Sequence, residues 1–344
     1  MKIIKYAILF LCLVFILSCE NLLVRPADSN KHLADFEAAW NRINDVYPYL
    51  EFKNIDWDSI YTEYLPRVEA AQGDEFYFVL HDFLAELKDG HVYYQTDGGG
   101  EVYPFYPQRH FKDRHAYSPF VIRTYFDKEL IVTESGSAEY EILPNNIGYV
   151  FLSDFQENYL TDEFPGIMNY LQNTVGMIID IRQKRGGSVH NVEAVVSRFI
   201  SELLDKPGFF VLGEEWILPP FQPQGSFTYT NPVAVLINGS TFSAGEYCTE
   251  VLKQLPHVTA IGDTTGGGSA GGTSYPPEAI TEYYLPSGKM IDVGTCDLRR
   301  YDGLPWEWLG VPPDIYVEQT AEDIENGIDN ILEYAIDLIE AKND

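Results

Sequence analysis

The sequence predicts an α/β fold in which a helical region precedes a largely parallel sheet. Apolar strands, glycine-containing turns and helical segments alternate from residue 146 to residue 261, which is the pattern of βαβ units. Before residue 88, apolar side chains recur at three- and four-residue spacing, as they do on the buried face of a helix. The 344 residues, 45% of them hydrophobic, suffice for a sizeable core and one to three domains.

The first residues predict a targeting signal. Lys2 and Lys5 precede an apolar stretch at 7–17 that is too short to span a bilayer. It ends at Ser18-Cys19, which resembles a bacterial lipobox, so we expect a lipoprotein signal peptide at 1–18 and a lipidated Cys19. This would anchor the protein to a membrane of the bacterial cell envelope, facing the periplasm or the exterior, with inner or outer membrane left open. The alternative is an ordinary signal peptide with an incidental cysteine.

A helical region and a β-rich region are expected next. A polar tether at 19–32 precedes a helical subdomain at 33–90, and a small β-rich linking region follows at 91–145. Apolar and aromatic periodicity places the individual elements. The expected helices are 33–47, 57–71 and 75–87, and the expected strands are 92–94, 120–125 and 130–133.

The remainder, 146–344, is predicted to be the α/β core. Its strands are short apolar runs that end in turn residues, and its helices carry apolar residues at helical spacing. The expected strands are 146–155, 175–181, 233–237 and 258–261, and the expected helices are 164–174, 192–204, 243–254 and 321–341.

Composition excludes several functional classes. The formal charge is -29, whereas a nucleic-acid partner requires clustered Lys and Arg, so none is expected. No Cys/His spacing suggests zinc, and neither GxGxxG nor GxxxxGK is present, so neither a metal nor a cofactor is predicted. Cys248 and Cys296 either form one disulfide or are two separate buried thiols.

Ser243 is the first candidate for chemistry. The apolar strand 233–237 stops at Asn238-Gly239, and a helix is predicted from Ser243. A serine in such a turn presents its hydroxyl beside unpaired backbone N–H groups, which is the geometry that acyl transfer needs. Ser243 can equally be a helix cap that forms a capping box with Glu246. Ser240 is a rival nucleophile that lacks the glutamate three residues on.

A serine nucleophile needs a base and a binding site for negative charge. His91 follows Asp89-Gly90, where helical periodicity gives way to a strand, although it can also be an ordinary turn histidine. Gly186-Gly187 closes the buried strand 175–181 and leaves backbone N–H groups accessible to a ligand. The glycine-rich stretch 262–272 is expected to be a mobile loop beside the site.

Six motifs, in order, resemble the tail-specific, or carboxy-terminal processing, serine protease family, in the branch related to the tricorn protease core. The resemblance covers the chain from about residue 33 to its end. The motifs are Leu87-Lys-Asp-Gly-His91, Asn146-Ile-Gly-Tyr-Val150, Asp180-Ile-Arg182 with Gly186-Gly187, Ser243-Ala-Gly-Glu246, Gly262-Asp-Thr-Thr-Gly266 and Gly310-Val-Pro-Pro-Asp314. This family implies a Clp protease/crotonase-like α/β core with an N-terminal helical subdomain, here with a small β-rich insert.

The resemblance also implies roles for individual residues. Ser243 matches the family nucleophile, His91 the base of the tricorn-like branch, and Glu307 the acid of that branch, three residues before Gly310. The oxyanion hole is then the amide of Ala244 together with that of Gly186 or Gly187. The implied activity is serine endopeptidase cleavage of unfolded or exported polypeptides.

Three departures from the family pattern bear on function. Gly268 stands where the tail-specific branch has its lysine base, which excludes a Ser–Lys dyad there. Gly90 replaces a serine that assists the histidine in part of the tricorn-like branch. Only about 50 residues separate His91 from Asn146, too few for a full PDZ domain. An extended peptide bound by strand addition is therefore expected in place of capture of a free C-terminus.

Two other functions fit the same scaffold. One is a non-catalytic module that binds a peptide or a retinoid-like apolar ligand, suggested by the missing lysine and by the 24 Tyr and 20 Phe residues. The other is an esterase that uses the same triad on a small acyl substrate. Convergence of His91, Ser243 and Glu307 favours hydrolysis over binding alone.

Overall fold

The structure is a computed structural model that describes residues 27–109, 115–153, 155–183, 186–269, 271–272 and 276–343. The predicted signal peptide and Cys19 lie outside these residues. Among the described residues, no helix has the length and apolar character that a membrane span requires. The chain forms two compact units. Among the described residues, the first unit contains those within 27–88, 92–105 and 280–293, and the second unit contains those within 89–91, 106–279 and 294–343.

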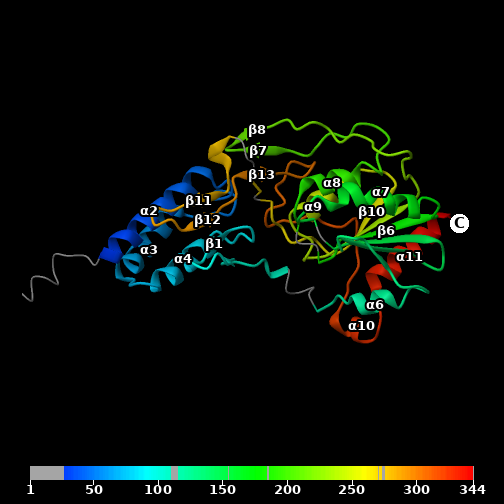
Figure 1. Ribbon diagram of the computed structural model, residues 1–344, viewed down its shortest axis with the longest axis horizontal. Helices are drawn as coiled ribbons and strands as arrows, with labels where there is room; N and C mark the ends of the chain where they lie inside the picture. The colour runs from blue at the N-terminus through cyan, green and yellow to red at the C-terminus, as the bar shows by residue number, and fades with distance from the viewer. Residues whose placement is uncertain are drawn as a thin grey trace, which may run out of the picture. The chain divides into compact units, whose positions relative to one another are not determined.

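The first unit packs three helices with a small antiparallel sheet (Figure 1). Its helices bury the aromatic residues whose spacing predicted them, including Phe36, Trp57 and Phe83. The sheet joins strands from two distant parts of the chain in the order β11-β12-β1-β2. The elements are α2 (Ala27–Val46), α3 (Trp57–Ala70), α4 (Glu75–Ala85), β1 (Tyr93–Gln95), β2 (Glu101–Val102), β11 (Glu282–Tyr284) and β12 (Met290–Asp292).

The second unit is built on a seven-stranded sheet of order β14-β10-β9-β6-β5-β4-β3. From β14 to β5 neighbouring strands are parallel, whereas β5, β4 and β3 pair antiparallel. The mixed α/β class with a largely parallel sheet is therefore confirmed. The strands are β14 (Ile315–Tyr316), β10 (Val258–Gly262), β9 (Val233–Ile237), β6 (Gly176–Asp180), β5 (Ile147–Leu152), β4 (Ala138–Ile142) and β3 (Ile131–Val132).

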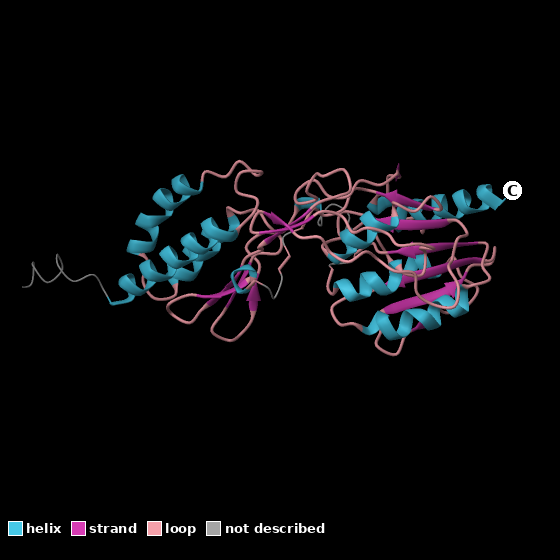
Figure 2. Cartoon of the chain, turned by 90° about the horizontal axis from the view of Figure 1, so that it is seen from above, coloured by secondary structure: helices cyan, strands magenta, loops and turns pink. Residues whose placement is uncertain are grey.

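Helices cover both faces of this sheet (Figure 2). Helices α7 (Tyr159–Leu171), α8 (Val189–Val196) and α9 (Ala244–Leu252) bury one set of strand side chains. Helices α6 (Pro119–Arg123) and α11 (Asn330–Asn343) bury the alternate set. Because both faces are covered, β6 and β9 are buried along their whole length, which explains their continuous apolar sequences.

Smaller elements complete the second unit. One is a separate antiparallel sheet of order β13-β7-β8. Its strands are β7 (Phe209–Val211), β8 (Glu214–Glu215) and β13 (Cys296–Leu298). A 3₁₀ helix spans Pro277–Ala279, and α10 spans Ala321–Glu325. Buried Arg182, just after β6, bonds Asp180 at 2.7 Å and Asp329 at 2.8 Å. This cluster ties the end of β6 to the start of α11.

Four expectations about secondary structure were wrong. The predicted strand 120–125 is helix α6, because Ser118 caps Val121 N–H and Pro119 occupies the first turn. The predicted helix 321–341 is interrupted at Gly327, where φ is 79°, and α11 starts after Asp329, which accepts from Leu332 N–H.

The other two errors concern helix ends. Helix α2 begins at Ala27, within the predicted tether. This start was not predicted because the first turns of the helix are polar and show no apolar periodicity. Helix α8 ends at Val196 although apolar residues continue to Leu204, where Leu204 pairs with Phe221 in an isolated bridge.

Candidate active site

Ser243 lies in the turn between β9 and α9, one residue before the helix begins. Its backbone has φ 53° and ψ −120°, a conformation that residues with a side chain rarely adopt. A strained strand–turn–helix of this kind presents a serine hydroxyl at the end of a sheet. The Ser243 N–H donates to Glu246 Oε2 at 2.9 Å, so the first turn of the helix holds the strained residue.

The backbone of Gly186 packs directly against Ser243. A Cβ on Gly186 would lie 3.0 Å from Ser243 Oγ and 3.1 Å from the nitrogen of Ala244. Ala244 is the first residue of α9, so its N–H has no acceptor within the helix. Gly187 instead lies against Phe155, whose carbonyl oxygen would be 2.2 Å from a Cβ at 187. Of the two glycines, Gly186 is therefore the one beside the hydroxyl.

The His91 ring lies against the turn that carries Ser243. It stacks on the ring of Phe242, the residue directly before Ser243, with centroids 4.6 Å apart and planes 27° apart. Gly90 is equally close, since a Cβ there would lie 3.0 Å from Phe242 Cζ. Neither ring nitrogen of His91 has a hydrogen-bond partner among the described residues, although both are buried. Packing against Phe242 thus holds the imidazole in place.

Three carboxylates act on the charge of His91. Burial, the largest single effect, lowers the pKa of His91, but Asp89, Glu307 and Glu246 together raise the pKa above its ordinary value. Asp89 is the closest, with Oδ1 3.7 Å from His91 Nδ1 and 2.8 Å from the His91 backbone nitrogen. An imidazolium at this place is therefore stabilised, which is what a general base needs after it accepts a proton.

Asp89 was missed as a functional candidate because the sequence showed it only as part of an Asp-Gly turn. The structure buries its side chain and anchors one carboxylate oxygen on the His91 N–H. Phe242 was missed as well, since an apolar residue before a serine carries no chemical signal. The stacking of Phe242 on His91 arises only from the tertiary fold.

Glu307 is fully buried beside a loop formed by residues 265–269. Its Oε2 accepts the N–H of Ser269 at 2.9 Å. The two preceding amides of the same loop, those of Gly267 and Gly268, donate to Glu246 at 2.8 and 2.9 Å. Successive N–H groups thus bind both buried carboxyl groups, which offsets the cost of placing these polar groups in the interior.

This loop differs from the expected mobile loop. Residues 265–269 are buried, and Thr265 both donates to Glu246 and accepts from Val311 N–H. Glu246 likewise does more than cap its helix, because three of its four bonds reach this loop. Glycine is required at 267, where φ is 85° and the backbone contacts Trp308.

Gly268, which stands where the tail-specific branch is expected to have its lysine, lies against the ring of Phe242. A Cβ at Gly268 would lie 2.0 Å from Phe242 Cζ, so a side chain at 268 cannot coexist with this ring. The ring that excludes a lysine is the same ring that stacks on His91. Both features are therefore contacts of the single Phe242 ring.

The remaining candidates are placed as follows. Ser240 is buried in the same turn but lies three residues farther from the helix than Ser243. Cys248 and Cys296 are buried and form no disulfide. Across the described ranges, no three His, Cys, Asp or Glu side chains are grouped to hold a metal ion.

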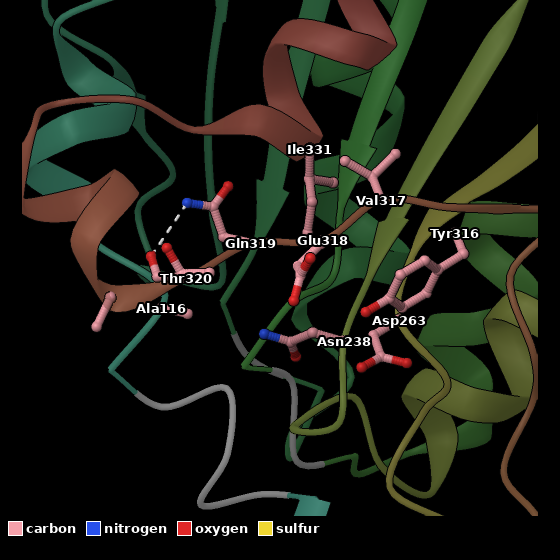
Figure 3. A pocket seen from close by; sticks show the side chains of 10 residues that line it. Ala116, Asn238, Asp263, Tyr316, Val317, Glu318, Gln319, Thr320 and Ile331 are labelled. Atoms are coloured by element: carbon pink, nitrogen blue, oxygen red, sulfur yellow. Dashed lines mark hydrogen bonds between the residues drawn. The ribbon is translucent and has the colours of Figure 1, made fainter.

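A separate cavity of about 220 Å³ lies at the carboxyl ends of β9, β10 and β14 (Figure 3). Its lining includes Asn238, Asp263, Tyr316 and Glu318. None of Ser243, His91 and Glu307 lines it.

The chain matches two protein-family patterns. Residues 146–317 match Peptidase family S41, and residues 28–85 match the Tricorn protease C1 domain. The first match covers half of the chain and contains Ser243 and Glu307, whereas His91 lies between the two matches. The curated carboxy-terminal processing protease CtpB of Bacillus subtilis is 24% identical over 189 residues, which are 53% of this chain and 36% of that protein.

Solved structures support the same assignment. A candidate peptidase from Parabacteroides merdae is 26% identical, with a TM-score of 0.77 over 90% of this chain and 96% of that one. Mature CPAF shares the fold, at a TM-score of 0.67 and 14% identity, over 91% of this chain and 97% of that one. The chain spans little more than a third of the length of CtpB. The protein belongs to peptidase family S41, a family of serine-type peptidases.

Proposed function

We propose that this protein is a serine endopeptidase that cleaves unfolded or exported polypeptides through Ser243, His91 and Glu307. The observation that carries the proposal is the packing of His91 on Phe242, directly before the strained Ser243. Membership of family S41 supports the enzyme class, and carboxy-terminal processing is the activity named for its curated relatives.

In the proposed reaction, His91 accepts the proton of the Ser243 hydroxyl as its oxygen attacks the substrate carbonyl carbon. The N–H groups of Ala244 and Gly186 are proposed to bind the oxyanion that develops, a role supported by the packing of Gly186 against Ser243 and the nitrogen of Ala244. The imidazolium then protonates the leaving amine, and water hydrolyses the acyl-enzyme by the reverse transfers. Negative charge from Glu307 stabilises the imidazolium, and we assign Asp89 a supporting role in the same task.

The polypeptide is proposed to bind in an extended conformation, by strand addition at a sheet edge. We further propose that Cys19 carries a lipid anchor and that the enzyme acts at a membrane of the bacterial cell envelope. The lipobox-like sequence at 16–19 supports this location. Cleavage of unfolded chains suits an extended binding mode, since a folded domain cannot supply a free strand.

The proposal predicts cleavage of a reduced and alkylated polypeptide at internal bonds, with loss of activity after treatment with a fluorophosphonate. The same polypeptide in its folded, disulfide-bonded form should remain intact. Mass spectrometry of the fragments and of the labelled enzyme measures both results. Hydrolysis of small esters without any peptide cleavage would favour the esterase alternative, and the absence of cleavage and of labelling would favour a binding module.

A further inference from the structure

Glu246 is a fully buried carboxylate with four hydrogen-bond donors directed at it. Oε1 accepts from Thr265 Oγ1 at 2.6 Å and from Gly267 N at 2.8 Å. Oε2 accepts from Gly268 N and from Ser243 N, both at 2.9 Å. A capping role accounts only for the bond to Ser243, because the other three donors are 19 to 22 positions away in sequence.

These bonds connect Ser243 to Glu307. The loop that Glu246 holds continues to Ser269, whose N–H binds Glu307. The segment around Glu307 is bonded back to the loop, since Trp306 Nε1 donates to Gly268 O at 3.2 Å and Trp308 N donates to Gly267 O at 2.9 Å. One continuous set of hydrogen bonds thus runs from the strained serine, through Glu246 and the loop, to the acid.

We propose that Glu246, in its ionised form, is a positioning residue that fixes Ser243 and the Glu307 loop relative to one another. The inference rests on the proposed function of Ser243. It adds Glu246 to Ser243, His91 and Glu307 as a residue that acts by positioning the groups proposed for catalysis. Three of the four donors are backbone N–H groups, which can only donate. The ionised carboxylate can accept all four bonds. A protonated acid would have to donate to Thr265 Oγ1, which now donates to Glu246, and an amide would place its own N–H groups against at least one backbone N–H group.

Glu246 is expected to change its protonation state near neutral pH. Burial raises its pKa, the four hydrogen bonds lower it, and the result is about 7. The charge of Glu246 acts on His91, from the segment before β1, and so do Asp89 of the same segment and Glu307 of the segment before β14. Arg109 donates to the carbonyl of Thr265, the residue whose hydroxyl binds Glu246. Because the charge of Glu246 raises the pKa of His91, the two titrations are coupled.

The test is the rate of fluorophosphonate labelling at Ser243 from about pH 5 to pH 9, with Glu246→Gln and a matched control, Glu250→Gln. Glu250 lies one turn further along α9 and is also buried, and its carboxylate accepts the backbone N–H of Tyr301 at 2.9 Å. Wild type should show an acid limb with a limiting slope of two, because both His91 and Glu246 must lose a proton. Glu246→Gln should react about 100-fold more slowly at pH 8, as expected for a misplaced nucleophile.

The acid limb of Glu246→Gln should have a slope of one and lie at lower pH, because a negative charge near His91 has been removed. The Glu250→Gln variant should keep the wild-type rate and limb. Equal rates and limbs for wild type and Glu246→Gln would overturn the inference. If Glu246→Gln does not fold, a slope of one in wild type overturns it and a slope of two supports it. Failure of wild type to label at any pH would instead overturn the assignment of Ser243, and this inference with it.

Discussion

Replacement of Ser243 by alanine is expected to lower kcat for peptide cleavage by roughly 10⁶-fold and to abolish covalent labelling. The substitution removes the hydroxyl beside Gly186 and Ala244 but keeps the Cβ and the backbone N–H that binds Glu246. The strained turn is therefore retained, and the thermal unfolding midpoint should change little. Peptide cleavage, labelling and thermal unfolding on the same preparation measure these effects.

Ser240→Ala is the matched control, because Ser240 is buried in the same turn. It should retain labelling and most of the peptidase activity. The opposite pattern, in which Ser240→Ala is inactive and Ser243→Ala is labelled at the wild-type rate, would show that Ser240 is the nucleophile and that the assignment to Ser243 is wrong.

Replacement of His91 by alanine should have a similarly large effect on kcat, since the nucleophile and base of a triad act as one unit. The pKa of His91 is raised above its ordinary value, so wild-type activity should fall as the pH drops through a value above about 6.5. The base acts only when neutral, which sets the sign of this dependence. In His91→Ala, the pH profile of the residual rate should no longer show the fall at low pH that protonation of His91 causes in wild type.

His257→Ala is the control for histidine loss in the same unit. His257 is partly buried and precedes β10, and its pKa is lowered by burial. Its replacement should leave the pH profile of kcat unchanged. Retention of the wild-type rate by His91→Ala would mean that another group accepts the proton from the serine.

The α/β core could be predicted because its signals are local. The strand Val233–Ile237 is continuous and apolar, and the structure reproduces its bounds. The turn at 238–243 and the helix after it follow from ordinary turn and helix signals. The resemblance to the family, carried by six short motifs, is confirmed by the match over residues 146–317.

Other features depend on tertiary contacts that no local pattern encodes. Strand β12 pairs with β1 across almost two hundred positions and β11 pairs with β12, and nothing in the short sequence of β12 indicates β1 as its partner. Helix α6 was mistaken for a strand because Val121 and Ile122 favour strands by propensity, whereas Ser118-Pro119 determines the local structure. Propensity was outweighed by capping.

The site shows the same division. Ser243 and His91 could be singled out from their residue types and turn positions, and Glu307 only through the resemblance. Asp89, Phe242 and the amides of Gly267 and Gly268 could not be found, because their roles consist of contacts. At Gly268 the sequence shows only that a lysine is missing, whereas the structure shows the ring of Phe242 in the space that a side chain there would need.

The most direct test is a crystal structure with a peptide boronic acid, which forms a covalent adduct with an activated serine. We expect boron on Ser243 Oγ, with one boronate oxygen about 2.7–3.1 Å from the nitrogens of Ala244 and Gly186. A ring nitrogen of His91 should lie within hydrogen-bond distance of the adduct. Boron bound to a different residue, or an imidazole turned away from the adduct, would contradict the account.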